Sequence, residues 1–452
     1  MTLELNNKQV LVLGLGDTGL SALRWLKSQG ASLSVADSRT NPPGLETVRA
    51  EFPGVAVHLG PFKPDVLAQA ELIISSPGVA LAEPAIQAAM TRGIPVVGDV
   101  ELFAQYKPAH AKVIAISGAN GKSTVTTLVG EMCKAAGLTT VVAGNIGLPV
   151  LEALALPAAD VYVLELSSFQ LETTHSLQAD AATVLNVTED HMDRYAGMAE
   201  YAAAKARIFN GSGVQVLNRE DEWSRGMALP GREVISFGTD MPGHESDFGL
   251  QQQDGKVLLL QGNTRLLGAD EMHIAGLHNA VNALASLALC RAIGLEFAPL
   301  LQALRTFKGL PHRVEWVAEQ NGVSFYDDSK GTNVGATCAA LAGLPQKVVL
   351  IAGGDGKGQD FSPLREPVAS NARAVVLIGR DAPQIAKVLQ ETGVALLQAA
   401  SLEEAVTVSY QAAQPGDAVL LSPACASFDM FRNYVHRAEV FVSAVKALKV
   451  AA

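Results

Sequence analysis

The sequence has few of the features that mark secreted, membrane-embedded or nucleic-acid-binding proteins. Its 452 residues include only four cysteines, and charged residues make up 17% of the chain. Asp and Glu (45) outnumber Lys and Arg (34), which gives a formal net charge of −11. No apolar run approaches the roughly 18 residues that span a bilayer, and the N-terminus lacks the pattern of a signal peptide. A general binder of nucleic acid or anionic membrane needs a broad cationic surface, so these classes are excluded.

The spacing of the cysteines excludes a zinc ribbon, because Cys133, Cys290, Cys338 and Cys425 form no CxxC pair. Each lies in an apolar or Ala-rich stretch, so we expect buried free thiols in a reducing compartment. The sequence therefore predicts a cytoplasmic protein with neither nucleic acid nor a membrane among its partners.

Length and hydrophobic patterning predict an α/β protein with three domains. Domains average about 150 residues, and hydrophobic residues at 48% exclude extended disorder. Short apolar runs alternate with amphipathic stretches, which is typical of parallel strands covered by helices on both faces. We predict a Rossmann-like domain over residues 1–99, a P-loop domain over 100–309 and a second Rossmann-like domain over 310–452. The P-loop domain should have a mostly parallel sheet, with a small antiparallel elaboration within residues 211–268.

The individual strands that we expect are continuous apolar runs. They cover residues 10–15, 33–36, 72–75, 95–97, 113–116, 161–166, 183–187, 256–260, 323–326, 348–352, 374–378, 394–398 and 418–421. Helices are expected between them, most clearly over residues 20–29, 124–136, 200–209 and 278–293.

The first glycine-rich turn has the GxGxxG spacing. Gly14, Gly16 and Gly19 follow an expected strand and precede an expected helix, where glycine allows close approach of a phosphate to the backbone. Asp37 ends the next strand, where a carboxylate can bind a ribose hydroxyl. The motif alone indicates a nucleotide. It leaves open a dinucleotide or a turn that merely packs closely.

The second glycine-rich turn, SGANGKST over residues 117–124, predicts an ATP site. It follows a strand and opens a helix, so its N–H groups can ring a phosphate while Lys122 reaches the β- and γ-oxygens. A hydroxyl of Ser123 or Thr124 can ligate Mg²⁺. The loop departs from GxxxxGK[ST], because Ile116 occupies the position of the first glycine. A hydride-transfer enzyme has no use for such a loop.

Three further residues stand out on chemical grounds. Glu165 ends an apolar strand beside the predicted ATP loop, where a carboxylate can hold Mg²⁺. His191 lies in a polar cluster after another strand and is either a metal ligand or an ordinary surface histidine. Lys205 lies within an Ala-rich helical stretch, and its residue type alone indicates a solvated lysine.

Together these motifs resemble the Mur ligase family, the ATP-dependent amide ligases of bacterial peptidoglycan precursor synthesis. The motifs that carry the resemblance run in family order over residues 118–124, 144–147, 165–172, 191, 278–282, 313 and 328–330. Within the family the chain is most similar to the members that add D-glutamate, on residues 13–19, 76–78, 328–333, 353–357 and 421–427. The DNPR-like segment of the diaminopimelate-adding members is missing.

The resemblance implies a reaction and its cofactors. ATP would phosphorylate the carboxylate of UDP-N-acetylmuramoyl-L-alanine, and the amine of D-glutamate would attack the acyl phosphate through a tetrahedral intermediate. Ser123 and Glu165 would hold one Mg²⁺, and His191 with Lys205 a second. An ammonium group cannot ligate Mg²⁺, so Lys205 would be carbamylated by CO₂, as the matching family lysine is, which supplies oxygen ligands.

The remaining site residues are carried over by the same resemblance. The catalytic set would be Lys122, Glu165, His191, Lys205 and Arg313. ATP would contact Gly118, Asn120, Gly121, Lys122, Ser123, Thr124, Asn279, Asn282, Arg313 and Asp328. The UDP substrate would contact Gly14, Gly16, Thr18, Gly19, Asp37, Arg39, Ser76, Gly78 and Asn145. D-Glutamate would contact His191, Lys330, Thr332, Lys357, Ser427, Phe428 and Tyr434.

Rival functions can be separated by simple observations. A folylpolyglutamate synthase shares the ligase chemistry but has no N-terminal UDP domain. A nicotinamide-dependent oxidoreductase built on the first glycine-rich turn would bind NADH in a fluorescence titration. A non-catalytic nucleotide-binding regulator has no need of Lys122, Glu165, His191 and Lys205 together. We also expect a monomer, and a hinge near residue 309 that closes the third domain over ATP.

Overall fold

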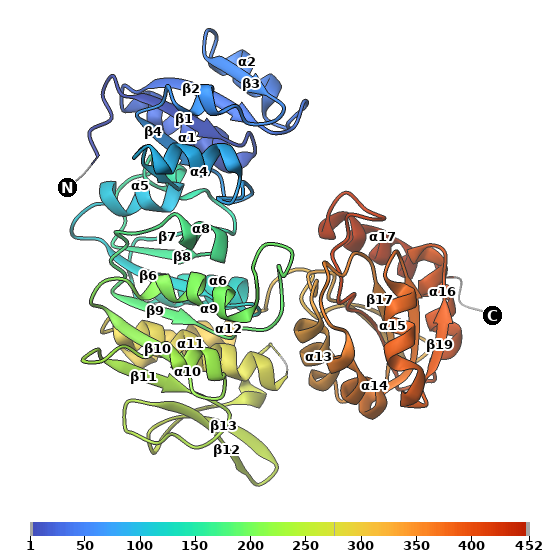
Figure 1. Cartoon of the computed structure of the whole chain (residues 1–452). Helices are drawn as coiled ribbons and strands as arrows, with labels where there is room; N and C mark the ends of the chain where they lie inside the picture. The colour runs from blue at the N-terminus through green and yellow to red at the C-terminus, as the bar shows by residue number, and fades with distance from the viewer. Residues whose placement is uncertain (1–2, 275, 449–452) are drawn as a thin grey trace.

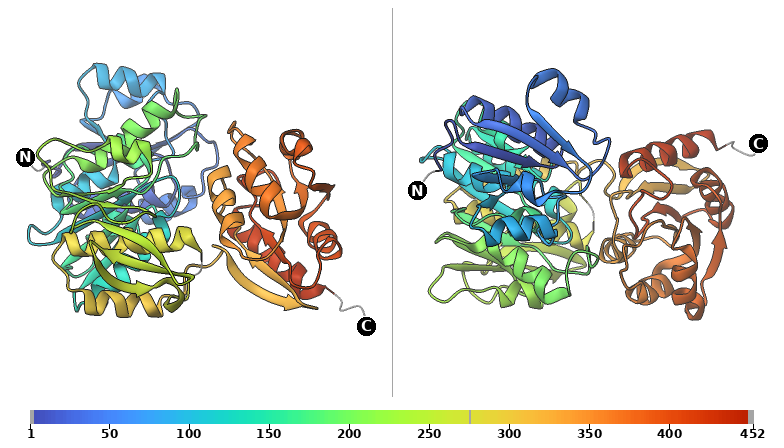
Figure 2. Two further views of the ribbon diagram at one scale, coloured as in Figure 1. Left: turned by 90° about the horizontal axis from the view of Figure 1, so that it is seen from below. Right: turned by 45° about the horizontal axis from the view of Figure 1, so that its top comes forward.

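Three sheets, one after another along the chain, form the core of the protein. The structure is a computed structural model that describes residues 3–274 and 276–448. In Figure 1 the first two sheets with their helices are stacked, and the last part of the chain stands to one side. Both views in Figure 2 show the same separation, with the C-terminal part joined to the rest over a narrow region.

The N-terminal sheet is parallel and has the order β3-β2-β1-β4-β5. Chain order reverses beside β1, which lies between β2 and β4, and such a reversal opens a crevice at the carboxyl ends of the strands. Its elements are β1 (Gln9–Leu13), α1 (Asp17–Ser28), β2 (Ser32–Asp37), α2 (Leu45–Glu51), β3 (Ala56–Leu59), α3 (Pro64–Leu67), β4 (Leu72–Ser75), α4 (Pro84–Thr91), β5 (Val96–Val97) and α5 (Asp99–Tyr106).

The central sheet has nine strands in the order β14-β13-β12-β11-β10-β9-β6-β8-β7. Strands β6 to β12 are parallel, whereas β12, β13 and β14 form antiparallel hairpins at one edge. Its elements are β6 (Lys112–Ser117), α6 (Lys122–Ala135), β7 (Thr140–Gly144), α7 (Val150–Ala153), β8 (Val161–Glu165), α8 (Ser168–Glu172), β9 (Ala181–Val184), α9 (Met198–Ala206), β10 (Val214–Asn218), α10 (Glu222–Gly226), β11 (Val234–Phe237), β12 (Phe248–Gln253), β13 (Lys256–Gln261), β14 (Thr264–Gly268), α11 (Leu277–Ala292) and α12 (Phe297–Thr306).

The C-terminal sheet has the order β15-β16-β20-β17-β18-β19 and is parallel except for the edge strand β15. Its elements are β15 (Glu315–Gln320), β16 (Val323–Asp327), α13 (Val334–Gly343), β17 (Val348–Gly353), α14 (Arg365–Asn371), β18 (Ala372–Ile378), α15 (Ala382–Leu389), β19 (Ala395–Gln398), α16 (Leu402–Ala412), β20 (Ala418–Leu421) and α17 (Tyr434–Ala447). Short 3₁₀ turns cover Arg207–Phe209, Ala269–Glu271, Ser362–Leu364 and Gln390–Thr392.

Apolar helix faces hold the central sheet in place. Helix α6 buries Val125, Leu128, Val129 and Met132 in one cluster with α11 and α12. These positions recur every three or four residues, as one face of a helix requires. The N-terminal end of α6, which follows the predicted ATP loop, is thereby fixed to a rigid core.

The α/β fold class with mostly parallel sheets and an antiparallel elaboration is confirmed. The limits of the expected strand over 183–187 are wrong, because β9 covers Ala181–Val184. The next residues form backbone hydrogen bonds with Ser117 and Ala119 of the second glycine-rich turn. Strand β1 ends at Leu13, where Gly14 adopts a φ of 89°. Strands β3 and β7 were not predicted, since their residues are partly exposed and lack a continuous apolar run. The individual strands β10, β11, β12, β14 and β15 were not predicted either, and β10 and β11 are parallel although they lie in the stretch expected to be antiparallel. The domain limits at 99 and 309 stay predictions.

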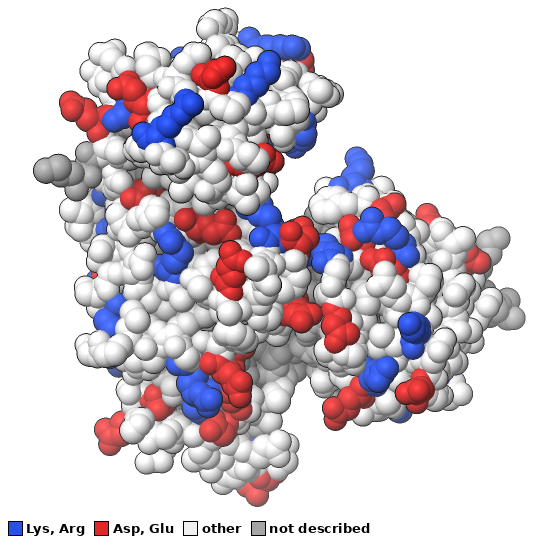
Figure 3. All heavy atoms as spheres, viewed as in Figure 1, with Lys and Arg blue, Asp and Glu red and all other residues white. Residues whose placement is uncertain are grey.

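Two surface features complete the description. Among the described residues, no helix has the length and apolar character needed to cross a bilayer. Figure 3 shows acidic and basic side chains interspersed on one face, with a deep notch between the N-terminal and C-terminal parts. Of the four free cysteines, Cys133, Cys290 and Cys425 are buried as predicted, whereas Cys338 is only partly buried.

Candidate active site

The loops that carry the candidate residues leave the carboxyl ends of neighbouring strands. In the central sheet, β6 lies between β9 and β8, so the loop at residues 118–121 is flanked by the residues that follow each of them. In the C-terminal sheet, β20 lies between β16 and β17 in the same way. Ligands of open α/β sheets bind at such edges.

The ATP loop has a backbone that only glycine permits at two points. Gly118 and Gly121 have φ values of 151° and 85°, and a Cβ at Gly121 would lie 2.6 Å from Oδ1 of Asn282. Asn186, after β9, accepts from the N–H of Asn120 at 2.8 Å and donates to its carbonyl oxygen at 3.1 Å. Lys122 donates to the carbonyl oxygens of Gly118 and Ala119 within the loop. The loop is thus fixed before any phosphate arrives.

A cavity of ≈ 330 Å³ extends from this loop toward the C-terminal domain. Predicted ATP residues that line it are Asn120, Gly121, Thr124, Asn279, Asn282, Arg313 and Asp328. Residues that the sequence analysis missed are Asn186, Thr188, Asn218, Glu220, His278, Gly335, Ala336, Ala339 and Ala340. Asn186 and Thr188 follow β9, and Asn218 and Glu220 lie at or just after the end of β10, a signal that was available in the sequence. His278 lies on α11, and the residues from Gly335 to Ala340 lie on α13.

The cavity is closed by contacts between the central and C-terminal domains. Asn333 donates to Oδ1 of Asn120 at 3.1 Å. Lys330 donates to Oγ of Ser123 at 3.2 Å, and Nη2 of Arg313 lies 3.4 Å from the same oxygen. These contacts bring candidate ATP residues from both sides of residue 309 together, and the divided ATP site stays a prediction.

Positive charge is concentrated around Ser123. Burial together with Arg313 and Lys122 lowers the pKa of Lys330 to about 8. Burial is also the main reason that the pKa of Lys122 is lowered, although Glu165 opposes it. The Nε of Arg313 is buried and has no hydrogen-bond partner within the described part of the chain. Closely spaced cationic side chains with unused hydrogen-bond donors are suited to bind the oxygens of a phosphate group.

Glu165 has one satisfied and one free carboxylate oxygen. Its Oε1 accepts from Nδ2 of Asn145 at 2.8 Å, whereas its buried Oε2 has no partner among the described residues. Leaving a buried carboxylate oxygen unpaired is unfavourable. A divalent cation would satisfy it with the hard oxygen ligand that Mg²⁺ prefers.

Lys205 is 1% exposed, so the prediction from residue type alone, a solvated lysine, is wrong. Its Nζ donates to the carbonyl oxygen of Gly118 at 3.0 Å and lies 4.5 Å from the ring centre of Tyr201. Burial, with Lys122 as a second cause, brings the pKa of Lys205 well below its usual value. The amine therefore becomes neutral more readily than an exposed lysine.

His191 adopts a left-handed backbone, with φ of 58°, and its ring packs edge-on against Phe169 at 4.8 Å. Burial lowers its pKa and so favours the neutral imidazole that ligates metals. Its neighbour Asp190 forms an ion pair at 2.8 Å with Lys357 of the C-terminal domain. Burial raises the pKa of Asp190, but Lys357 and His191 bring it below its usual value overall.

A second cavity, of ≈ 570 Å³, lies where the N-terminal sheet faces the central domain. The predicted residues on its lining are Gly14, Gly16, Thr18, Asp37, Arg39, Ser76, Gly78 and Asn145. Gly19 is not among the residues that line the cavity. It packs against the backbone of β1's end instead, since a Cβ at Gly19 would lie 1.9 Å from the carbonyl oxygen of Gly14. It therefore serves the close packing of α1 on β1.

Asp37 is largely occupied by its own loop. Oδ2 accepts from the N–H of Leu15 at 2.7 Å, and both oxygens accept from the guanidinium of Arg39. Burial would raise the pKa of Asp37, but the hydrogen bonds from Arg39 and Leu15 hold it below its usual range. The pair fixes the floor of the cavity and leaves part of Arg39 exposed.

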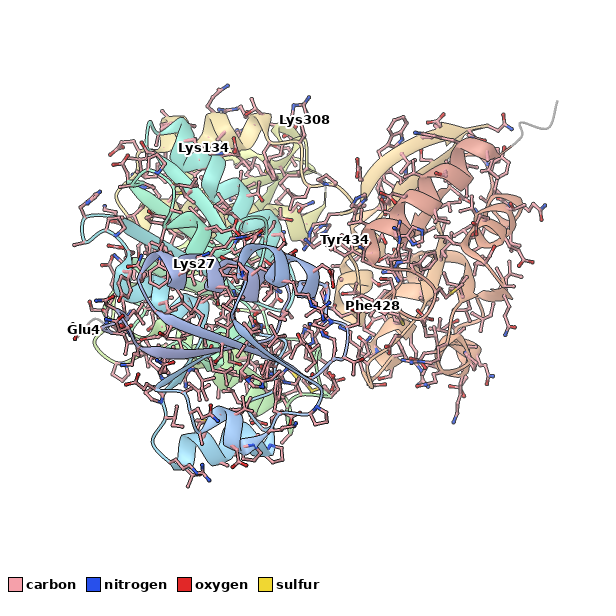
Figure 4. All side chains as sticks on the ribbon, turned by 90° about the horizontal axis from the view of Figure 1, so that it is seen from above. Glu4, Lys27, Lys134, Lys308, Phe428 and Tyr434 are labelled. Carbon is pink, nitrogen blue, oxygen red and sulfur yellow. The ribbon has the colours of Figure 1, made fainter. Side chains whose placement is uncertain are left out.

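Of the predicted D-glutamate residues, His191 lies in the central domain between β9 and α9. The others follow strands β16, β17 and β20 of the C-terminal sheet, with Tyr434 as the first residue of α17. Figure 4 shows Phe428 and Tyr434 on the side of this domain that faces the rest of the chain. Phe428 is 74% exposed, whereas Ser427 is buried. The ammonium of Lys330 lies 5.4 Å from the ring centre of Tyr434, so the aromatic ring forms a wall beside the cation.

Comparison with known proteins gives matches along the whole chain. Three family models match in order: the N-terminal domain of MurD-like Mur ligases over residues 8–98, the Mur ligase middle domain over 116–290 and the Mur ligase glutamate ligase domain over 312–425. The chain is 68% identical to a UDP-N-acetylmuramoylalanine–D-glutamate ligase of Methylobacillus flagellatus, over 99% of this chain and 98% of that one. It is 58% identical to the enzyme of the same name from Thiobacillus denitrificans, with the same coverage of each chain.

Solved structures share the fold at low sequence identity. The UDP-N-acetylmuramate–alanine ligase MurC of Thermotoga maritima has a TM-score of 0.62 at 20% identity, over 98% of this chain and all of that one. The MurF ligase of the same organism, solved in complex with ADP, has a TM-score of 0.58 at 16% identity, over 98% of this chain and 96% of that one.

Proposed function

This chain belongs to the Mur ligase family, and we propose from the site geometry how it ligates D-glutamate to UDP-N-acetylmuramoyl-L-alanine with hydrolysis of ATP, in peptidoglycan precursor synthesis. The single observation that carries the proposal is the full-length match, at 68% identity, to a relative named for this reaction. Two cavities support it, one at the predicted ATP loop and one where the N-terminal sheet faces the central domain.

The cavity at the ATP loop takes ATP. Backbone N–H groups at the start of α6 and the side chain of Lys122 hold its phosphates. Asn279 and Asn282, three residues apart on α11, contact the nucleotide from the same helix face. Arg313 and Asp328 contribute from the C-terminal domain, so the site is complete only when the two domains meet. The remaining loop residues, Gly118, Asn120, Gly121, Ser123 and Thr124, surround the phosphates.

The residues present fit two Mg²⁺ ions. Ser123 and the unpaired oxygen of Glu165 would hold one, and His191 and a carbamylated Lys205 the other. Bound Mg²⁺ would supply charge neutralisation between phosphate and carboxylate groups. A carbamate forms when a neutral amine attacks CO₂ and loses a proton, and the lowered pKa of Lys205 favours the neutral amine that this reaction needs.

The cavity on the N-terminal sheet takes the uridine diphosphate of the first substrate. Gly14, Gly16, Thr18, Ser76 and Gly78 offer backbone groups and hydroxyls to the diphosphate and sugar. Arg39, oriented by Asp37, and Asn145 also contact this substrate. Its alanyl carboxylate then points toward the γ-phosphate of ATP.

The chemistry requires anions to meet. An oxygen of the alanyl carboxylate attacks the γ-phosphorus and ADP leaves, which forms an acyl phosphate. The amine of D-glutamate attacks the acyl carbon, and the tetrahedral intermediate collapses to the amide and inorganic phosphate. Lys122, Arg313 and Lys330 stabilise the charge that develops on these oxygens, because they are already positioned and partly desolvated.

D-Glutamate is held by the C-terminal domain near His191. Lys357, Thr332 and Ser427 bind its carboxylates, Lys330 lies near the phosphates, and Phe428 and Tyr434 form apolar walls. When D-glutamate binds, the ammonium of Lys357 leaves its ion pair with Asp190 and pairs with a carboxylate of the substrate. Residues 1–99, 100–309 and 310–452 act as three units of a cytoplasmic monomer.

The experiment is phosphate release from Mg-ATP and UDP-N-acetylmuramoyl-L-alanine, in bicarbonate buffer, with D-glutamate, L-glutamate or no amino acid. We expect release only with D-glutamate, together with a product heavier by one glutamyl residue. Release without an amino acid, or equal release with both enantiomers, contradicts the proposal. A parallel titration with NADH tests the oxidoreductase alternative and should show no binding.

A further inference from the structure

Arg437 is a fully buried arginine whose side chain joins two active-site loops. It lies in the first turns of α17 and is 0% exposed. Its Nε donates to Oγ of Ser329 at 3.0 Å and its Nη2 to the carbonyl oxygen of Ser329 at 2.8 Å. Its Nη1 donates to the carbonyl oxygen of Cys425 at 3.1 Å. One planar guanidinium therefore holds the chain after β16 and the chain after β20 at a fixed separation.

Both joined loops carry candidate residues for the amino acid substrate. Ser329 immediately precedes Lys330, and Cys425 lies two residues before Ser427. The hydroxyl of Ser329 in turn donates to the carbonyl oxygen of Tyr434 at 2.8 Å. The guanidinium thus fixes the relative positions of the Lys330 ammonium, the Ser427 hydroxyl and the Tyr434 ring.

The partners of Arg437 indicate why the residue is an arginine. Among the described residues, all its hydrogen-bond acceptors are neutral oxygens, and burial lowers its pKa to about 10. Burying a cation without a hydrogen-bonded carboxylate is unfavourable, and an apolar side chain would fill the space at less expense in free energy. Only arginine offers several donors in a rigid plane that reaches two loops at once.

We propose that Arg437 is a positioning residue that sets the distance between the Lys330 loop and the Ser427 loop, and thereby the fit of the amino acid substrate. It touches no substrate itself. The inference rests on the proposed function, since it assigns D-glutamate to these loops. Two carboxylates on one small molecule must meet groups from both loops, so a change in their separation weakens that substrate most.

The test compares the KM for D-glutamate, for ATP and for the UDP substrate in three variants. We expect Arg437→Met to raise the KM for D-glutamate at least about tenfold and to leave the KM for the UDP substrate within about twofold. The KM for ATP should rise by a smaller factor than that for D-glutamate, because Asp328 and Lys330 flank Ser329. Ser329→Ala removes one acceptor without removing the buried charge, and should raise the KM for D-glutamate by a smaller factor than Arg437→Met does. Arg437→Lys should fall between wild type and Arg437→Met, because a lysine cannot reach both loops.

The matched control is Phe441→Leu. Phe441 is also a buried residue of α17, but its side chain has no hydrogen-bonding group that could join the two loops. It should lower the melting temperature without changing the KM for D-glutamate. Wild type is assayed alongside, and if it makes no D-glutamate-dependent product the proposed function itself fails. If wild type is active and the Arg437 and Ser329 variants change all three KM values equally, or none, the positioning role is overturned. Should Arg437→Met not fold, Ser329→Ala and Arg437→Lys decide.

Discussion

The ammonium nitrogen of Lys205 lies 3.0 Å from the carbonyl oxygen of Gly118, 87 residues earlier in the chain. The contact ties the end of α9 to the ATP loop and leaves the amine with a neutral oxygen as its hydrogen-bond acceptor. A buried lysine without a carboxylate partner is costly as a cation. The proposed carbamylation replaces this buried cation with a negatively charged carbamate.

The first prediction concerns this amine. Lys205→Ala should lower kcat by more than about 100-fold, because the ligand proposed for the second Mg²⁺ would be lost. Burial lowers the pKa of Lys205 and so favours the neutral amine over what an exposed lysine shows, and ¹³C-labelled bicarbonate should give one protected carbamate signal by NMR. Lys134→Ala is the control, because Lys134 is exposed and pairs with Glu131 on the same helix. A Lys205→Ala protein with full activity, or the same signal after the substitution, contradicts the assignment.

The second prediction concerns the unpaired oxygen of Glu165. Glu165→Gln keeps the size of the side chain and an acceptor for Asn145, but removes the charge that would face the proposed Mg²⁺. We expect the Mg²⁺ concentration for half-maximal activity to rise by about 10–100-fold. Glu131→Gln, on the exposed face of α6, should leave the Mg²⁺ titration unchanged. An unchanged titration for Glu165→Gln shows that this carboxylate does not hold the ion.

The third prediction concerns the ion pair between Lys357 and Asp190, 2.8 Å apart across the two domains. Lys357→Gln should raise the KM for D-glutamate by about 10–100-fold, because a charged hydrogen bond to a carboxylate is worth roughly 1.5–3 kcal/mol. The KM for ATP should change little. Lys347→Gln is the control, since that exposed lysine donates to the carbonyl oxygen of Ser370. Equal effects of the two substitutions would remove Lys357 from the substrate site.

The fourth prediction is a pH dependence of stability that arises from Asp328. Burial raises the pKa of its carboxyl from 3.8 to about 7, although the hydroxyl of Ser422 opposes the shift. The unfolded chain ionises near 3.8 and the folded chain near 7, so this group destabilises the fold as pH rises through that interval. Below 3.8 both states are protonated and the effect vanishes.

Asp328→Asn should therefore gain stability relative to wild type as pH rises from 4 to 8, by about 1–4 kcal/mol. Denaturant unfolding at both pH values measures the difference. Asp254→Asn, in a β-turn of the antiparallel edge, is the control and should show no such trend. A constant difference between Asp328→Asn and wild type contradicts the raised pKa.

The parts of the candidate site that could be predicted from the sequence are short motifs located just after strands. Glycine-rich turns reveal a backbone requirement, so residues such as Gly14 and Gly121 could be recognised without a structure. The fold class followed from continuous apolar runs in the same way. Lys205 and His191 could not be assigned from residue type, because burial and neighbouring charge decide their chemistry.

Residues that act by contact with a distant segment of the chain, and that lie outside any recognisable motif, were not identified from the sequence. Asn186 supports the ATP loop from a different strand, and the face of α13 closes the ATP cavity from another domain. Arg437 resembles an ordinary helix residue until the fold places it between two loops. Such relationships depend on which strands are neighbours in a sheet, and strand order is not set by local patterning.

The most direct test of the account follows one oxygen atom. UDP-N-acetylmuramoyl-L-alanine labelled with ¹⁸O in its alanyl carboxylate is incubated with the enzyme, Mg-ATP and D-glutamate, and the released phosphate is analysed by mass spectrometry. An acyl phosphate carries one carboxylate oxygen to the phosphate, so we predict one ¹⁸O in each phosphate released from doubly labelled substrate. Unlabelled phosphate, with amide product still formed, would contradict activation of the carboxylate by ATP.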